Sequence, residues 1–158
     1  MSDGGVSISK PMSKVEQRAM AVFNRALGGL HTWVYKKSGG VMGGHFVGGA
    51  PVVLLTTLGR KSGKARTCPL IYLCDGDRLI LVASKGGHPH HPAWYMNLCS
   101  QPMVEVQLGE QHSKMRAVTA TREQKAKYWP RLCAIYPPYQ SYQNRTDRDI
   151  PVVILEPT

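Results

Sequence analysis

The densest group of positive charges in this chain is the segment TTLGRKSGKART, residues 56–67. Its glycines let backbone amides approach an anion, and each arginine or lysine would add a charge-assisted hydrogen bond worth about 1.5–3 kcal/mol. The segment contains no acid and repels itself, which favours a bound anion. It lacks the GxxxxGK[ST] spacing of a nucleotide-binding P-loop, and the alternative is a solvated hairpin tip. Its four cations are Arg60, Lys61, Lys64 and Arg66.

Residues 83–98, ASKGGHPHHPAWYMNL, form a second candidate anion site. We expect Ser84 and Lys85 to end a strand, the glycine pair after them to expose backbone amides, and a short helix to begin at Ala93. A strand end, an amide-rich turn and a helix start together favour a bound anion. The histidines suggest a metal site instead, but they alternate with prolines and offer no i, i+4 pair and no nearby acid, so we expect no metal.

Three tyrosines recur at intervals of three in residues 136–151, YPPYQSYQNRTDRDIP. Tyr136, Tyr139 and Tyr142 offer flat apolar faces with polar tips, a combination suited to a planar ligand. The alternative is a tyrosine cluster that closes the core. The charged residues that follow are expected to form a local salt-bridged turn: Arg145, Asp147, Arg148 and Asp149.

The chain shows no pattern typical of nucleophilic or acid–base catalysis. No Ser-His-Asp or Cys-His arrangement is placed for it, and the carboxylates are few and dispersed. A redox reaction carried by a bound cofactor needs neither.

The chain is predicted to form a single domain, residues 1–158, because 42% of its residues are apolar. Its formal charge of +10 favours an anionic partner: nucleic acid, an acidic membrane surface, or a phosphorylated or polycarboxylate small molecule. The four cysteines form no CxxC pair and no signal peptide is recognised, so we expect reduced thiols in a cytoplasmic protein. No apolar run approaches the ~20 residues that cross a bilayer.

The N-terminal third is predicted to be less regular than the rest. Residues 1–14 are expected to form a flexible tail, and residues 15–50 a variable helix followed by a glycine-rich connector. Residues 33–37, WVYKK, are expected to end the helix against the core, and the alternative is a peripheral contact with an anionic membrane. Residues 51–158 would then form the cofactor-binding core.

The core is predicted to contain about six strands. VVLLTTL is a buried strand, CPLIYLC and RLILVAS form a hairpin across DGD, MVEVQL and SKMRAVTA form a second across GEQH, and PVVILEP closes the chain. Mostly antiparallel strands with short helices between them indicate an α+β fold, a small mixed-sheet barrel.

Two helices are predicted between these strands. One makes about two turns between Pro92 and Pro102. The other starts at a capping box formed by Thr121 and Gln124, and Pro130 is expected to kink or split it. The expected apolar face of the second helix contains Ala126, Trp129, Leu132 and Cys133.

Taken together, LLTTLGRKSGKARTCPLIY, ASKGGHPHHPAWYMNL and YPPYQSYQNRTDRDIPVVILEP closely resemble the deazaflavin-dependent nitroreductase family of mycobacteria and other actinobacteria. The resemblance runs from about Val53 to Pro157. It implies an FMN-binding split β-barrel of the pyridoxamine-phosphate-oxidase type. It also implies coenzyme F-420, an 8-hydroxy-5-deazaflavin with a phosphate and an oligoglutamate tail, and such a tail would account for the cationic segment.

The resemblance also implies roles for individual residues. Near the phosphate and glutamates it places Arg60, Lys61, Ser62 and Arg66. Around the deazaflavin it places Thr67, Cys68, Pro69, Leu70, Ile71, Val82, Ala83, Ser84, Lys85, Ala93, Trp94, Tyr95, Met96 and Asn97. On the substrate side it places Ser84, Tyr136, Tyr139 and Tyr142, with Tyr139 also beside the deazaflavin. Cys68 before Pro69, and Met96 before the asparagine, depart from the commoner family pattern and could alter the shape of the pocket.

The implied activity is hydride transfer from C5 of the reduced deazaflavin to a planar electrophile. Tyrosine hydroxyls and Ser84 would bond the acceptor oxygen as negative charge develops on it. Quinones are the preferred acceptors, with nitroaromatics and activated enones as secondary ones. Three alternatives stay open: an FMN-dependent reductase on the same barrel, a cofactor carrier without catalysis, and a basic nucleic-acid-binding protein, which the lack of a recognisable motif disfavours.

Overall fold

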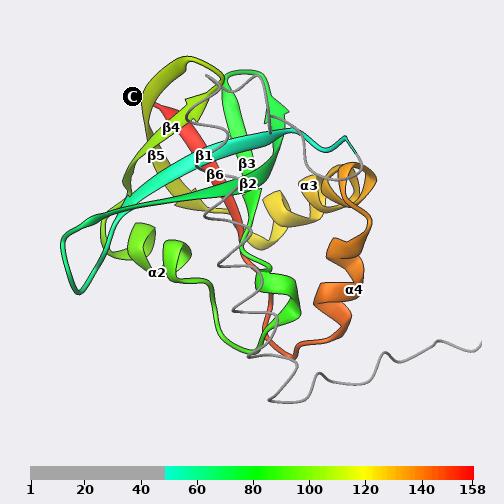
Figure 1. The fold of residues 1–158 in the computed structure, drawn as a ribbon. Helices are drawn as coiled ribbons and strands as arrows, with labels where there is room; N and C mark the ends of the chain where they lie inside the picture. Colours follow the sequence, from blue (N-terminus) through cyan, green and yellow to red (C-terminus); the bar gives the residue numbers. More distant parts are fainter. Residues whose placement is uncertain (1–48) are drawn as a thin grey trace, which may run out of the picture.

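Six antiparallel strands form a closed barrel in the computed structural model, which describes residues 49–158 (Figure 1). Their order around the barrel is β1-β2-β3-β6-β5-β4. The predicted split barrel of about six strands is confirmed, but every pair in this part of the chain is antiparallel, so the sheet is not mixed. The strands are β1 Val52–Leu58, β2 Ala65–Asp75, β3 Arg78–Val82, β4 Met103–Leu108, β5 Gln111–Thr119 and β6 Val152–Pro157.

Helices fill two of the connections between strands. A short 3-10 helix η1, Lys85–Gly87, and helix α2, Ala93–Ser100, lie between β3 and β4, whereas α3, Arg122–Ile135, and α4, Pro138–Asn144, lie between β5 and β6. Helix α2 lies across one end of the barrel, and η1 lies beside α4 near the same end (Figure 1). No helix within residues 49–158 is long and apolar enough to cross a membrane.

The predicted tail, N-terminal helix and WVYKK segment all fall in residues 1–48. They lie outside the described residues, so these expectations stay predictions.

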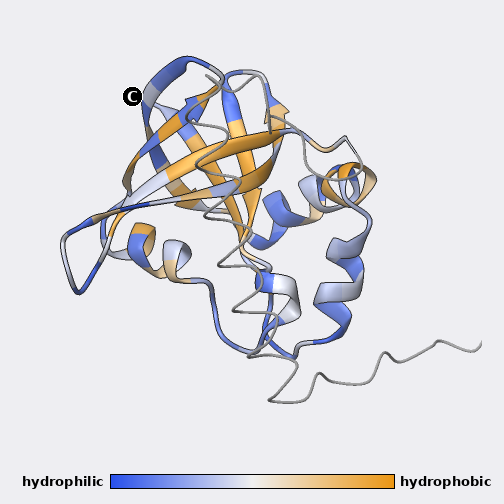
Figure 2. Cartoon of the chain, viewed as in Figure 1, coloured by the Kyte–Doolittle hydropathy of each residue, from blue (hydrophilic) through white to orange (hydrophobic). Residues whose placement is uncertain are grey.

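Strand β6 is apolar on both faces because each face meets a different core. Val153 and Leu155 belong to a cluster inside the barrel, whereas Val152 and Ile154 belong to a second cluster against α3 and α4. Successive side chains of a strand point to opposite faces, so an unbroken apolar run indicates a strand that is covered on both sides. Figure 2 shows the resulting apolar colouring along the barrel strands and the mixed colouring of helices α2 and α3.

Helix α3 begins at the predicted capping box. The Thr121 hydroxyl accepts a hydrogen bond from the Gln124 N–H at 3.2 Å, and the Gln124 side chain accepts one from the Thr121 N–H at 2.9 Å. These bonds satisfy backbone donors that a helix start would leave without partners. The helix then continues through Pro130 to Ile135 as one element, so the expectation of a split at Pro130 is wrong.

The inward face of α3 differs in part from the prediction. Trp129, Leu132 and Cys133 contact the second core cluster as expected, but Ala126 is exposed. Tyr128 is buried in its place and donates a hydrogen bond from its hydroxyl to a carboxylate of β2. Apolar periodicity misses such a residue, because a tyrosine can bury its ring while its hydroxyl reaches a polar partner at the edge of the core.

Candidate active site

The cationic segment forms the tip of the β1–β2 hairpin. Strand pairing reaches the residues on both sides of the tip, so the loop proper is residues 59–64 and the predicted loop 56–67 was too long. Backbone hydrogen bonds close it, from the Gly59 N–H to the Lys64 carbonyl at 2.8 Å and from the Gly63 N–H to the Gly59 carbonyl at 2.7 Å. The hydrophilic tip projects away from the barrel (Figures 1 and 2).

The four cations of this hairpin are all exposed. None of them belongs to the salt bridges within residues 49–158, which pair other side chains. Their charge is therefore not compensated by an acid in this part of the chain, and the hairpin offers a concentrated positive field to an anion.

The side chain of Asn97 joins α2 to the base of the hairpin. Its Oδ1 accepts a hydrogen bond from the Arg60 N–H at 3.1 Å, and its Nδ2 donates one to Thr57 Oγ1 at 3.1 Å. Both Asn97 and Thr57 are buried, so each bond satisfies a group that water does not reach. The family resemblance placed Asn97 beside the deazaflavin, but the sequence did not predict its contact with the hairpin.

The residues of strand β2 that were predicted to surround the deazaflavin lie on two different faces of the strand. Cys68 and Leu70 pack against the core inside the barrel, and strand alternation turns Thr67, Pro69 and Ile71 to the outer side. Burial raises the pKa of the Cys68 thiol to about 12. This cysteine is therefore a neutral packing residue at physiological pH and not a nucleophile.

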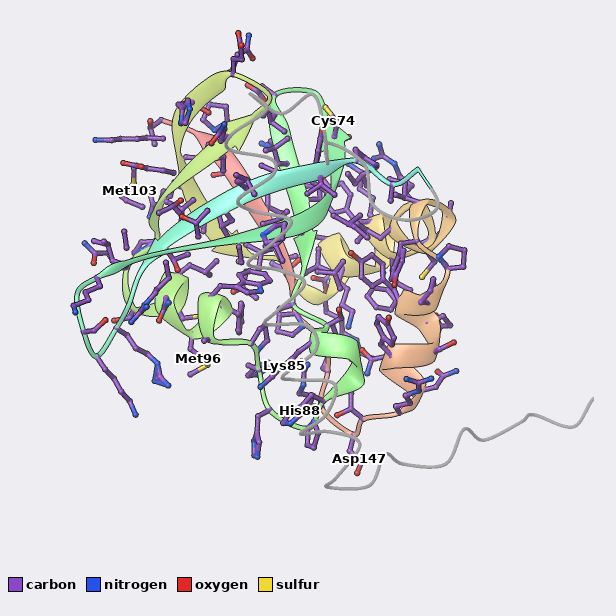
Figure 3. All side chains as sticks on the ribbon, in the orientation of Figure 1. Cys74, Lys85, His88, Met96, Met103 and Asp147 are labelled. Carbon is purple, nitrogen blue, oxygen red and sulfur yellow. The ribbon has the colours of Figure 1, made fainter. Side chains whose placement is uncertain are left out.

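Helix α2 likewise presents its predicted residues in different directions. Trp94 and Tyr95 pack against the barrel core, and the Tyr95 hydroxyl lies 3.1 Å from Thr119 Oγ1 of β5. Residues two apart on a helix point roughly 200° from each other, so Tyr95 and Asn97 lie on opposite sides of α2. Figure 3 shows Met96 on the side of this helix that is turned away from the barrel.

The turn that follows β3 carries Ser84 and Lys85 at the α2 end of the barrel (Figure 3). Three consecutive residues, Lys85, Gly86 and Gly87, have positive φ values of 47°, 63° and 77°. A Cβ atom added to Gly87 would lie 2.7 Å from the carbonyl oxygen of Tyr142. The glycine pair therefore permits a close approach between this turn and α4, in addition to exposing backbone amides.

Arg148 binds this turn and is not part of a local salt-bridged turn. Its Nη2 donates to the carbonyl oxygens of Ser84 at 2.7 Å and Ala83 at 3.2 Å, and its Nε donates to that of His88 at 2.8 Å. Its Nη1 lies 3.1 Å from Nδ1 of His91. These partners precede Arg148 by 57 to 65 residues, so no local pattern could indicate them.

The other members of the predicted salt-bridged turn also lie apart. Asp149 pairs with Lys125 of α3. The Arg145 guanidinium lies 5.8 Å from the centroid of the Tyr142 ring. Asp147 is exposed and forms none of the salt bridges within residues 49–158. The prediction is wrong because each charge finds a partner on another element or faces solvent.

The three tyrosines lie on or next to α4 and contact one another. The ring centroids of Tyr136 and Tyr139 are 5.0 Å apart, and the hydroxyl oxygens of Tyr136 and Tyr142 are 3.1 Å apart. Tyr139 is only 4% exposed and belongs to the second core cluster, whereas the other two are half-buried. Burial raises the pKa of both Tyr139 and Tyr142, so each stays a neutral phenol at physiological pH.

The histidine group is held by its neighbours in the chain. The His90 N–H donates to Nδ1 of His88 at 3.1 Å, and the His91 ring packs against Tyr95 with centroids 5.0 Å apart. Burial lowers the pKa of His88 and of His91, which favours neutral rings. Within residues 49–158 no group of three or more His, Cys, Asp or Glu side chains could hold a metal ion.

A cavity of about 830 Å³ lies on the Tyr95 side of α2. Of the site residues predicted from the sequence, Tyr95 alone lines it. The remaining predicted residues lie on the hairpin, on β2, at the end of β3 and the turn after it, elsewhere on α2, and on or just before α4. Other residues that line the cavity include His91, Thr119, Arg122, Trp129 and Val152.

The closed six-stranded barrel is a split β-barrel like that of solved F420-H2 dependent reductases, and this chain adds an exposed cationic hairpin and a cluster of neutral phenols. The chain belongs to the F420H(2)-dependent quinone reductase family, whose model matches residues 28–157. The family resemblance predicted from the three segments is confirmed.

Relatives and solved structures agree with this membership. The chain is 40% identical to the F420H(2)-dependent quinone reductase Rv1261c of Mycobacterium tuberculosis over 132 residues, which cover 80% of this chain and 87% of the relative. A solved F420-H2 dependent reductase, FDR-A, is 44% identical, with a TM-score of 0.62, and the match covers 67% of this chain and 94% of that one. A structure described as a domain-swapped dimer is 38% identical, with a TM-score of 0.63 and coverage of 79% and 98%.

Proposed function

We propose that this protein reduces quinones with the hydride of reduced coenzyme F-420, and that nitroaromatics and activated enones are secondary acceptors. Membership of the F420H(2)-dependent quinone reductase family supports the coenzyme and the quinone. The observation that carries the proposal furthest is the cationic hairpin, which has no acidic partner in the described residues and is fastened by Asn97.

The donor set of the site fits this coenzyme. A phosphate followed by several carboxylates needs a row of exposed cations, and Arg60, Lys61 and Arg66 provide one beside Ser62. The half-buried β2 residues and the turn at Ser84 would bound the flat deazaflavin. FMN carries a single phosphate and would leave most of the hairpin charge without a partner.

When bound, reduced F-420 supplies a hydride from its C5 carbon. The protein's own residues then align the acceptor and stabilise the charge that develops on it. Tyr136 and Tyr142 are half-buried, and α4 contacts the turn at η1. A neutral phenol can donate a hydrogen bond to the acceptor oxygen. A quinone that gains one hydride and one proton becomes a hydroquinone, so only one proton has to be delivered.

The test is anaerobic turnover of menadione by the purified protein with reduced F-420, followed by the absorbance of the reoxidised coenzyme. We expect turnover with reduced F-420 and little or none with reduced FMN at the same concentration. Nitroaromatic and enone acceptors are compared at equal concentrations, and we expect lower kcat/KM for both. Binding of the coenzyme without turnover of any quinone would identify a carrier and contradict the proposal.

A further inference from the structure

The guanidinium of Arg148 gathers its hydrogen bonds from one short segment, residues 83–91. All three of its nitrogens have a partner there: three backbone carbonyls and one histidine ring nitrogen. An arginine presents its donors in a rigid planar fork, so several carbonyls that converge on one guanidinium are fixed relative to one another. The segment carries Ser84 and Lys85, which are the residues predicted to face coenzyme and acceptor.

The arrangement differs from a salt bridge. No carboxylate pairs with Arg148 among the residues that the structure describes, and the neighbouring Asp149 pairs with Lys125. The charge of Arg148 is solvated by backbone carbonyl oxygens instead. A partly buried arginine held in this way fixes the backbone, and its removal would take one donor from each of those carbonyls.

The turn itself contains a strained backbone conformation. Lys85 has a φ of 47° and two further residues with positive φ follow it, a conformation that a lysine rarely adopts. The carbonyl of Ser84, directly before Lys85, receives the shortest of the Arg148 bonds, at 2.7 Å. Two backbone bonds hold the turn from within, from the Gly87 N–H to the Ser84 carbonyl at 3.0 Å and from the His88 N–H to the Lys85 carbonyl at 3.1 Å. The contacts of Arg148 add to these bonds next to the strained residue.

We propose that Arg148 is a positioning residue for the hydride-transfer site: it locks the turn at residues 83–88 so that Ser84 and Lys85 face the bound coenzyme and its acceptor. This inference rests on the proposed function, because that function supplies the coenzyme and the acceptor that Ser84 and Lys85 would face. The lock itself is a property of the protein alone and can be measured without coenzyme.

The pKa of His91 provides a measurable readout of the contact between Arg148 and this segment. Its Nδ1 accepts from the Arg148 guanidinium, so the neutral ring carries its proton on Nε2. Burial, and after it the charge of Arg148, lowers the pKa of His91. Tyr95 packs on the ring, and Arg122, Lys125 and Asp149 line the same cavity. Removal of the Arg148 charge leaves burial in place and deletes the repulsion, so the His91 pKa should rise.

The experiment compares two variants. Arg148→Met keeps a long unbranched side chain but has no hydrogen-bond donor. Arg148→Lys keeps the positive charge but replaces the planar guanidinium by a single ammonium group. Arg78→Met is the matched control, because Arg78 forms an exposed ion pair with Glu156 and lies beside the β2–β3 turn. Each folded variant is measured for the His91 pKa by NMR without coenzyme, for the Kd of oxidised F-420, and for kcat and KM with menadione.

We expect Arg148→Met to raise the His91 pKa and to lower kcat by about tenfold or more, because misplacement of aligning groups acts on the chemical step. The Kd of F-420 should change by less than about threefold, because most of the affinity is expected to come from binding of the tail to the hairpin. Arg148→Lys should restore part of kcat, and Arg78→Met should match the wild type in all readouts. A His91 pKa that does not move overturns the lock, whether or not the protein uses F-420.

Two further outcomes also overturn the inference. The first is a lower melting temperature of Arg148→Met with an unchanged kcat per folded molecule, which would reduce Arg148 to a stabilising residue. The second is an equal loss of kcat in Arg148→Met and Arg78→Met. If neither the wild type nor any variant turns over menadione while Arg148→Met still raises the His91 pKa, the proposed function fails and the contact of Arg148 with His91 stands. The two failures are therefore distinguishable.

Discussion

The buried amide of Asn97 lies 3.1 Å from the backbone nitrogen of Arg60, at the base of the cationic hairpin. The same amide donates to Thr57, so both of its ends are engaged with the hairpin and its orientation is fixed. A hairpin fastened in this way holds its cations in place before an anion arrives. Less conformational freedom is then lost on binding, which strengthens the interaction.

Replacing Asn97 by Leu should weaken both the fold and the hairpin. The substitution removes the partner of the buried Thr57 hydroxyl and of the part-buried Arg60 N–H, so the free energy of unfolding should fall by about 1–3 kcal/mol. The affinity for F-420 should also fall, because the cations are no longer held in place. Urea denaturation and a coenzyme titration measure the two effects. Gln101→Ala, an exposed change just after α2, is the control, and an unchanged F-420 affinity in Asn97→Leu would count against the fastening role.

The double substitution of Arg60 and Lys61 by Ala should weaken binding of long-tailed F-420 by about tenfold or more at low salt. A tail-less deazaflavin should lose much less, and the difference should shrink as salt screens the exposed charges. The matched control removes two exposed cations elsewhere, with Lys114 and Lys127 changed to Ala. An identical loss for both ligands would mean that the hairpin does not hold the tail.

Gly87→Ala should destabilise the protein more than Gly76→Ala does. Both glycines have positive φ, 77° and 65°, so both alanines pay the same backbone strain. At Gly76 no atom lies within 4 Å of the added Cβ, whereas at Gly87 the Tyr142 carbonyl would lie 2.7 Å from it. The excess loss in unfolding free energy should be about 1–3 kcal/mol. Denaturant titrations of the two variants measure it, and equal losses would show that the turn and α4 separate easily.

Tyr142→Phe should slow turnover while leaving the fold intact. Loss of one hydrogen bond that forms in the transition state, worth about 0.5–1.5 kcal/mol, lowers kcat by up to about tenfold. Tyr139→Phe should have a smaller effect, because Tyr139 is buried in the second core cluster and presents little surface to an acceptor. The comparison uses kcat with saturating menadione and reduced F-420. A larger effect of Tyr139→Phe would indicate that Tyr139, and not Tyr142, contacts the acceptor.

The strands of this fold could be predicted from the sequence because their signals are local. β-branched runs, the DGD turn and the alternation in MVEVQL indicate strands that the structure contains at nearly the same bounds. The capping box at Thr121 is local as well, since both of its partners lie within one helical turn. Helix α4 was not predicted from the sequence, although Pro138 suits the first turn of a helix.

The positioning contacts of the site could not be predicted in this way. Asn97 reaches Thr57 over 40 residues, and Arg148 reaches Ser84 over 64. Such contacts are set by how the barrel closes, and charge patterning alone assigned Arg148 to its nearest acids. The resemblance found which segments carry the site, and the folded structure was needed to find what holds them.

The most direct test of the central claim is titration of the purified apoprotein with oxidised F-420, with FMN as the parallel ligand under identical conditions. The cationic hairpin predicts that F-420 binds at least about tenfold more tightly than FMN at low salt, since its tail carries several anions against a single phosphate. The preference should narrow as the ionic strength rises. FMN binding that equals or exceeds F-420 binding at low salt would contradict the account.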